Sequence, residues 1–169
     1  LIDVNWDTTI GWDKLADLAR LAAAKNVSLI VWYNSAGDWN TVPYHPKDKL
    51  LTHESRTEEF SKLEKLGIRG IKVDFFGGDG QSMMDYYQEI LADAHAHHLV
   101  VNCHGSTIPR GLQRTWPNLV SMEAIRGFEH ATFGQETADK VPAKATTAPF
   151  IRNAFDPMDF TPVCFTAYD

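Results

Sequence analysis

The chain has 169 residues, of which 44% are hydrophobic and 22% charged, and its formal net charge is -6 at pH 7. These values are typical of a globular domain with a sizeable core. The negative charge and the lack of a basic cluster argue against nucleic acid or an anionic membrane surface as a partner. No apolar run is long enough to cross a bilayer. We therefore expect partners of neither kind.

Short apolar runs rich in β-branched residues recur along the chain and predict strands buried on both faces. Between the first four of these runs lie segments with apolar residues every three to four positions, and this spacing predicts helices. The second helix is expected to start with a capping box of Ser55 and Glu58 and to end at Gly67. The expected helices are 12–22, 55–66 and 83–94, and the expected strands are 1–4, 28–33, 70–76, 99–103, 119–122 and 149–154.

This alternation of strands and helices predicts a parallel sheet. No glycine-rich phosphate loop follows the first run, where the sequence reads Trp6-Asp7-Thr8-Thr9. Polar or aromatic residues instead follow every strand, which is typical of a (β/α)8 barrel. We predict an α/β fold that is a partial (β/α)8 TIM barrel, about strands 2 to 7. The chain starts without Met and residues 165–169 end without a covering helix, so we expect residues 1–169 to be a fragment cut at both ends.

Asp74 is the first candidate catalytic residue. It ends an apolar run and comes two residues after Lys72. A carboxylate at a barrel rim can attack an anomeric carbon, and a nearby cation would lower its pKa and keep it ionised. The alternative is an Asp that merely caps the following turn.

Glu123 and Glu129 are two further acids, six residues apart with Arg126 between them. Retaining glycosidases hold two carboxyl groups about 5–5.5 Å apart, and inverting enzymes hold theirs about 6.5–9.5 Å apart. Such acids also suit a hard cation such as Ca²⁺. The alternative is a surface pair bridged by Arg126.

Several other residues are weaker candidates. His104 follows a predicted strand and is placed to contact a sugar hydroxyl, and Trp6 and Asp7 occupy a similar position. Trp39, after Asp38, either stacks on a sugar ring or packs in its loop. The tract of His95, His97 and His98 is expected at a helix end facing solvent rather than at a metal. Cys103 is expected to be a buried free thiol, and Cys164 shows no metal-type spacing with it.

Four stretches together resemble glycoside hydrolase family 97, and the resemblance runs through nearly the whole chain. They are Gly70-IKVDFFGGDGQ-Ser82, Val101-NCHGSTIPRGLQRTWPN-Leu119, Met122-EAIRGF-Glu129 and Met158-DFT-Pro162. The family has a central (β/α)8 barrel between an N-terminal β-sandwich and a C-terminal β-domain. The resemblance implies that both flanking β-domains, the rest of its own polypeptide, are absent from this chain.

The family contains an inverting α-glucosidase branch and a retaining branch that includes α-galactosidases. The inverting branch uses two Glu as base, but the loop 33–37 has no Glu and His104 is followed by Gly105. Asp74 matches the nucleophile of the retaining branch, and Glu129 matches the general acid. The resemblance thus implies a retaining, exo-acting α-galactosidase-like enzyme; the alternatives are an inverting α-glucosidase and an inactive carbohydrate-binding barrel.

The resemblance also implies a cofactor, a substrate and a location. Glu123 and Glu129 resemble Ca²⁺ ligands of the family, with another ligand expected from the absent N-terminal domain. The expected partner is an oligosaccharide, and the expected location is the periplasm or the exterior of a bacterium. The residues expected to bind substrate are Asp7, Trp32, Lys72, His104 and Arg126.

Overall fold

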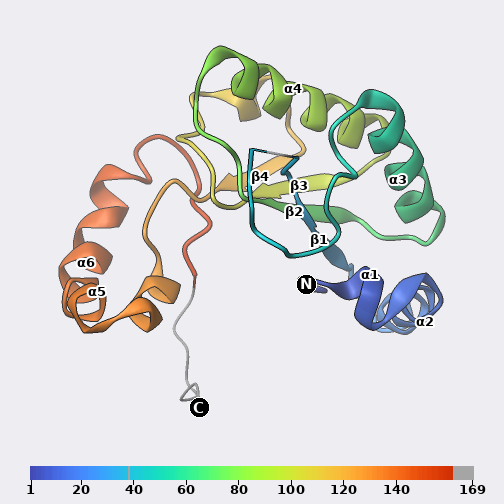
Figure 1. Ribbon diagram of the computed structural model, residues 1–169, viewed down its shortest axis with the longest axis horizontal. Helices are drawn as coiled ribbons and strands as arrows, with labels where there is room; N and C mark the ends of the chain where they lie inside the picture. Colours follow the sequence, from blue (N-terminus) through green and yellow to red (C-terminus); the bar gives the residue numbers. More distant parts are fainter. Residues whose placement is uncertain (38, 162–169) are drawn as a thin grey trace.

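The computed structural model describes residues 1–37 and 39–161 (Figure 1). Its centre is a parallel sheet of four strands in the order β1-β2-β3-β4, which confirms the predicted parallel α/β class. The expectations for Asp38, Cys164 and residues 165–169 lie outside the described residues. The strands are β1 Ile30–Asn34, β2 Gly70–Asp74, β3 Val100–Cys103 and β4 Leu119–Met122.

The three expected helices are confirmed, with bounds that differ by one or two residues from those predicted. The second helix also differs in its N-terminal cap. It begins earlier than predicted, because Thr52 has an extended backbone and its side chain accepts a hydrogen bond from the backbone N–H of Ser55 at 3.2 Å. The capping box therefore joins Thr52 and Ser55, and the prediction of Ser55 with Glu58 is wrong. The helices are α1 Trp6–Thr9, α2 Gly11–Ala23, α3 His53–Lys65, α4 Gln81–Ala96, η1 Leu112–Arg114, η2 Phe128–Phe133, α5 Gln135–Asp139 and α6 Val141–Ile151.

Two expected strands are not formed as predicted. Residues 1–4 make a single parallel bridge, between Ile2 and Val31, because the chain turns at Asn5 in the left-handed conformation. Residues 149–154 lie in the last turn of α6 and beyond it, since an apolar run without clear periodicity does not distinguish a strand from a buried helix. The position next to β4 is taken by Met158, which bridges Met122 in parallel.

The two faces of the sheet differ in polarity. The expectation of strands buried on both faces is confirmed for most positions of β1 and β2, while Val100 in β3 and Val120 in β4 are exposed. Side chains alternate between the faces of a strand. The apolar residues of one face belong to the core with α3 and α4, and among them is Cys103, a buried free thiol as predicted. The other face is more polar. Four residues that pair with one another across neighbouring strands lie on it: Trp32, Lys72, Asn102 and Ser121. Core residues of the first face are Val31, Tyr33, Ile71, Val73, Val101 and Cys103.

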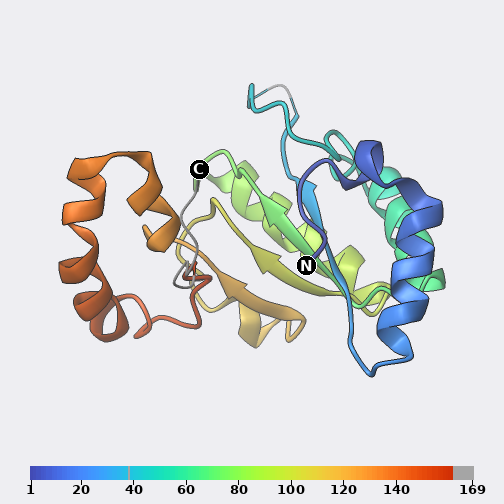
Figure 2. The ribbon, with the colours of Figure 1, turned by 90° about the horizontal axis from the view of Figure 1, so that it is seen from below.

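The carboxyl ends of the parallel strands meet at one edge of the sheet. α3 and α4 pack together on one face, while η2, α5 and α6 form a lobe beside β4 (Figures 1 and 2). Because the strands are parallel, the loops after β2, β3 and β4 converge near the β4 side of this edge, where the candidate site lies.

None of the described helices is long and apolar enough to span a membrane.

Candidate active site

Asp74 is the last residue of β2 and is buried, with 7% of its surface exposed. Phe75 follows it in the left-handed conformation, and its backbone N–H donates to Asp74 Oδ1 at 2.7 Å. The indole Nε1 of Trp32 donates to Asp74 Oδ2 at 3.3 Å. Trp32 therefore fixes the Asp74 carboxylate from the interior, and both oxygens have a donor.

The pKa of Asp74 does not shift in the direction expected from a nearby cation. Burial raises it, and the charge of His104 and the hydrogen bonds from Phe75 and Trp32 oppose that rise only in part. The Lys72 charge also acts to lower this pKa, but its effect is smaller. The Lys72 ammonium lies 3.6 Å from Asp159.

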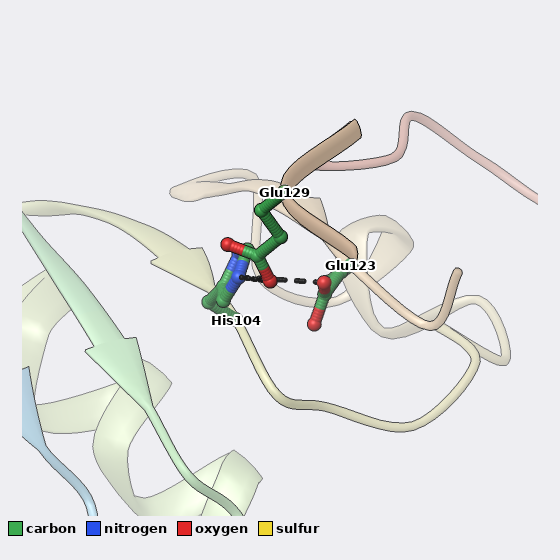
Figure 3. Close-up of side chains that lie close together, drawn as sticks. All are labelled: His104, Glu123 and Glu129. Atoms are coloured by element: carbon green, nitrogen blue, oxygen red, sulfur yellow. Dashed lines mark hydrogen bonds and ion pairs between the residues drawn. The ribbon is translucent and has the colours of Figure 1, made fainter. Parts of the chain in front are cut away.

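His104 follows β3 and lies at the centre of a cluster of acids (Figure 3). Its Nε2 is 3.1 Å from Glu129 Oε1 and 3.3 Å from Glu123 Oε1, and its Nδ1 is 2.6 Å from Asp159 Oδ2. The other oxygen of Glu123 accepts the backbone N–H of Gly105 at 2.7 Å. One imidazole thus joins residues that follow β3, β4 and the Met158 bridge with one residue of η2.

The electrostatics of this cluster are set by burial and by mutual attraction. Burial acts to lower the pKa of His104, but the hydrogen bond to Asp159 and the charges of Asp74 and Glu123 outweigh it and raise the pKa to about 9. Burial raises the pKa of Glu123. Burial also acts to raise the pKa of Asp159, but the hydrogen bond to His104 prevails and the pKa is lowered. At neutral pH His104 is therefore a cation among carboxyl groups.

A pocket of about 330 Å³ opens over this cluster. Asp74, His104, Glu123 and Glu129, all predicted from sequence, share it, so the structure brings together both predicted catalytic residues and both predicted metal ligands. The pocket is lined by Asp74, Phe75, His104, Gly105, Glu123, Glu129, His130 and Phe133.

Four of the predicted substrate-binding residues are not among those that line the pocket. Trp32, in β1, contacts the site only through its hydrogen bond to Asp74. Asp7 lies in α1; burial and then Glu59 raise the pKa of Tyr33, and the Asp7 charge adds a smaller effect. Arg126 is exposed, and no ion pair joins it to Glu123 or Glu129 in the described part of the chain. Lys72 lies within β2, on the sheet face that carries Trp32 and Asn102, and pairs with Asp159.

The remaining candidates have structural contacts. Trp6 is buried and donates through its indole N–H to the Trp32 carbonyl at 2.8 Å. Trp39 is half exposed and packs edge-on against Tyr86. His97 and His98, at the end of α4, contact Glu64. Among the described residues, the group whose potential ligand atoms lie within 4.8 Å of one another is His104, Glu123 and Glu129.

Asp159 is a site residue that the sequence did not predict, although it lies in the stretch 158–162 that resembles the family. The signal was present, because Asp159 follows Met158 just as His104 follows β3, at the carboxyl end of a strand position. That position is a single bridge and lacks the apolar run by which a strand is recognised.

Comparison with known proteins identifies the family. The family described as Glycoside hydrolase 97 matches residues 4–125. The chain belongs to glycoside hydrolase family 97. It is 39% identical over 163 residues to a probable retaining alpha-galactosidase of Streptomyces bingchenggensis, covering 96% of this chain and 22% of that protein. It is 31% identical over 169 residues to a retaining alpha-galactosidase of Bacteroides thetaiotaomicron, covering 95% and 23%.

Solved structures with the same fold include glycoside hydrolases. A beta-arabinopyranosidase crystal structure matches with a TM-score of 0.90 and 41% identity, over 96% of this chain and 26% of that one. A family 97 enzyme variant from Pseudoalteromonas sp. strain K8 in complex with panose matches with a TM-score of 0.70 and 22% identity, over 91% and 24%. The chain therefore spans about a quarter of the length of these relatives.

Proposed function

We propose that the chain carries the catalytic centre of a retaining, exo-acting glycosidase that removes terminal α-galactosyl or closely related residues. The observation that most supports this proposal is that Asp74 lines the same pocket as Glu129 and accepts hydrogen bonds from two N–H donors. The names of the two curated relatives support this assignment.

In the proposed mechanism Asp74 attacks the anomeric carbon as the glycosidic C–O bond breaks, giving a covalent β-glycosyl-enzyme. Glu129 donates its proton to the leaving oxygen in this step. Glu129, now a carboxylate, then takes a proton from the water that attacks the same carbon. Asp74 leaves, and the sugar is released as the α-anomer.

Gly105 counts against the inverting alternative. A Cβ built on Gly105 would lie 2.8 Å from Asp74 Oδ1 and 3.0 Å from the Phe75 backbone nitrogen. A glutamate base at this position therefore cannot coexist with the Asp74 carboxylate as it is placed here. An inactive binding barrel would not require a buried carboxylate facing a second acid across one pocket.

The names of the relatives indicate two kinds of sugar substrate. α-D-Galactopyranosides and β-L-arabinopyranosides carry ring hydroxyls and anomeric substituent in the same arrangement and differ by the hydroxymethyl group on C5. One relative is named for each kind of substrate. We therefore propose that the pocket accepts the arrangement shared by both sugars.

We further propose that Glu123 and Glu129 hold Ca²⁺. Carboxylate oxygens are the ligands that Ca²⁺ prefers. Oε1 of Glu123 is buried and accepts no hydrogen bond in the described part of the structure, although His104 Nε2 lies 3.3 Å away, so a bound cation would complete its contacts. The remaining ligands would come from other parts of the polypeptide. The bound ion would supply positive charge beside the acid and polarise it.

The sheet fits part of a (β/α)8 barrel. Four strands and the bridges at Ile2 and Met158 occupy six consecutive parallel positions, which supports strands 2 to 7. Because the relatives are about four times longer, we propose that this chain acts within a longer polypeptide whose other domains are its partners. A bacterial periplasmic or secreted location stays a prediction.

The deciding experiment follows the stereochemistry of hydrolysis in the full-length protein. Aryl α-galactoside and aryl β-L-arabinopyranoside are offered separately, and the first anomer formed is recorded by proton NMR before mutarotation. Retention should release α-galactose from the α-galactoside. Release of β-galactose would disprove both retention and the nucleophile role of Asp74.

The calcium proposal is tested by binding as well as by rate. Calcium titration calorimetry on the chelator-stripped full-length protein should show a site that Glu123→Gln weakens, and stripping should lower kcat. Glu136→Gln, on the exposed surface of α5, is the matched control and should bind as the wild type does. An unchanged kcat after complete removal of metal would refute the proposal.

A further inference from the structure

Asp159 holds the imidazole of His104 from the side opposite to Glu129. Its Oδ2 lies 2.6 Å from Nδ1, and Glu129 Oε1 lies 3.1 Å from Nε2. An ionised carboxylate only accepts hydrogen bonds, so Nδ1 carries the hydrogen in this contact. The ring plane is thereby fixed, with Nε2 directed at Glu129.

The position of Asp159 is itself fixed by β4. Its backbone N–H donates to the Met122 carbonyl at 3.2 Å, next to the bridge between Met122 and Met158. The buried guanidinium of Arg152 binds the carbonyls of Met122, Glu123 and Asp156 at 2.6, 3.2 and 2.9 Å. The end of β4 and the segment that carries Asp159 are thus joined through one side chain.

Asp159 is not among the residues that line the pocket above the cluster, and 23% of its side chain is exposed. Lys72 lies 3.6 Å from the Oδ2 that binds His104, which keeps a positive charge beside this oxygen. The same Nε2 also lies 3.3 Å from Glu123, so one ring orientation places two carboxyl groups. The contact of Asp159 that leads to the two pocket-lining glutamates is therefore the one with His104.

We propose that Asp159 is a positioning residue that, through His104, orients Glu129 for proton donation to the glycosidic oxygen. This inference rests on the proposed function of Glu129 as the acid. Hydrogen-bond partners of this kind, one shell away from the reacting groups, typically contribute about 10- to 100-fold when removed. Asp159 adds a member to the site that the predicted residues did not include.

The test compares substrates in the full-length protein. Leaving groups of high pKa need protonation and activated nitrophenolates do not. Asp159→Ala should lower kcat/KM by about 10- to 100-fold for an alkyl glycoside and by only a few-fold for a nitrophenyl glycoside. Asp159→Asn, which restores an acceptor for the Nδ1 hydrogen, should recover most of this difference. The ratio between two substrates measured on one sample is independent of the fraction of folded protein.

Two further variants separate the outcomes. Asp156→Ala, in the same segment but without a contact to His104, should leave the ratio unchanged. In a Glu129→Ala background, Asp159→Ala should have no further effect on the ratio. Equal losses on both substrates, or an undiminished effect without Glu129, would overturn the proposal. The ratio can be taken on whichever glycoside is cleaved, so a wrong sugar or stereochemistry for the proposed function would be seen separately.

Discussion

Two buried cations of this molecule, Arg56 and His104, each lie among carboxylates, but their surroundings differ. The Arg56 guanidinium, 2% exposed, donates to Asp93 at 2.6 Å, to Glu89 at 3.0 Å and to the Leu50 carbonyl at 2.9 Å. These contacts tie α3 and α4 to the loop after β1. The His104 cluster instead faces a pocket and contains the unsatisfied Glu123 oxygen.

The difference separates a structural cluster from a chemical one. Each of the three guanidinium nitrogens of Arg56 already donates to a group of the protein, and the side chain is buried away from any ligand. Unsatisfied polar atoms and shifted pKa values beside a cavity are what a reacting site requires. Perturbing the Arg56 cluster should therefore change stability alone, and perturbing the cluster at the pocket should change rate.

The largest effect is expected for Asp74→Gly. Loss of the nucleophile should lower hydrolysis of an α-galactoside by at least about four orders of magnitude. Azide should enter the vacated space and restore cleavage of an activated aryl substrate, giving the β-galactosyl azide, because it attacks from the face that the carboxylate used. Product analysis by NMR checks this. If Asp74 only capped a turn, its loss would cost about 1 kcal/mol of stability and azide would have no effect.

The next largest effect is expected on stability, for Asp93→Ala. It removes the closest carboxylate from a buried cation and should lower the free energy of unfolding by about 3 kcal/mol. Urea denaturation measures the loss, and kcat under conditions where the protein is folded should stay unchanged. Glu89→Gln is the control: Glu89 is 58% exposed, and its loss should cost less than about 1 kcal/mol. A fall in kcat for Asp93→Ala would remove the distinction between the clusters.

Gly105→Ala should lower kcat by about 10- to 100-fold, since small displacements of a reacting group have effects of this size. The new methyl group would meet Asp74 Oδ1 at 2.8 Å and displace the carboxylate. Gly67→Ala separates this contact from backbone strain. Gly67 has φ +77 against +53 at Gly105, but nothing lies within 4 Å of its built Cβ. Both variants should lose stability, and only Gly105→Ala should lose kcat.

The sequence indicated the parts of the fold that have a strong local pattern. Helix spacing located α2 and α4, and the apolar runs located β1 to β4. It could not show that residues 149–154 are helical or that Met158 takes the next strand position, since one bridge has no periodicity. Strand ends indicated Asp74 and His104, because parallel strands converge at one edge.

The rest of the candidate site depends on distances between loops, which the sequence does not contain. Arg126 lies between two acids in the sequence and yet is exposed, because the chain turns at Ala124 in the left-handed conformation. Asp159 reaches His104 across 55 positions of sequence. The expected effect of Lys72 on the pKa of Asp74 was too large for the same reason. A spacing of two residues along a strand does not show how deeply a carboxyl group is buried, and burial has the largest effect on this pKa.

The smallest expected effect concerns pH. Asp74 reacts as a carboxylate and its pKa in the folded protein is raised by burial, so activity should be present above this pKa and lost as pH falls through it. The acid limb of kcat/KM, which reports the free enzyme, should therefore lie at higher pH than for an ordinary aspartate. Trp32→Phe removes a hydrogen bond that lowers this pKa and should move the limb to still higher pH. Trp39→Phe, whose ring packs on Tyr86, should leave the limb in place. A limb that Trp32→Phe does not move, or moves to lower pH, would show that a group other than Asp74 titrates there.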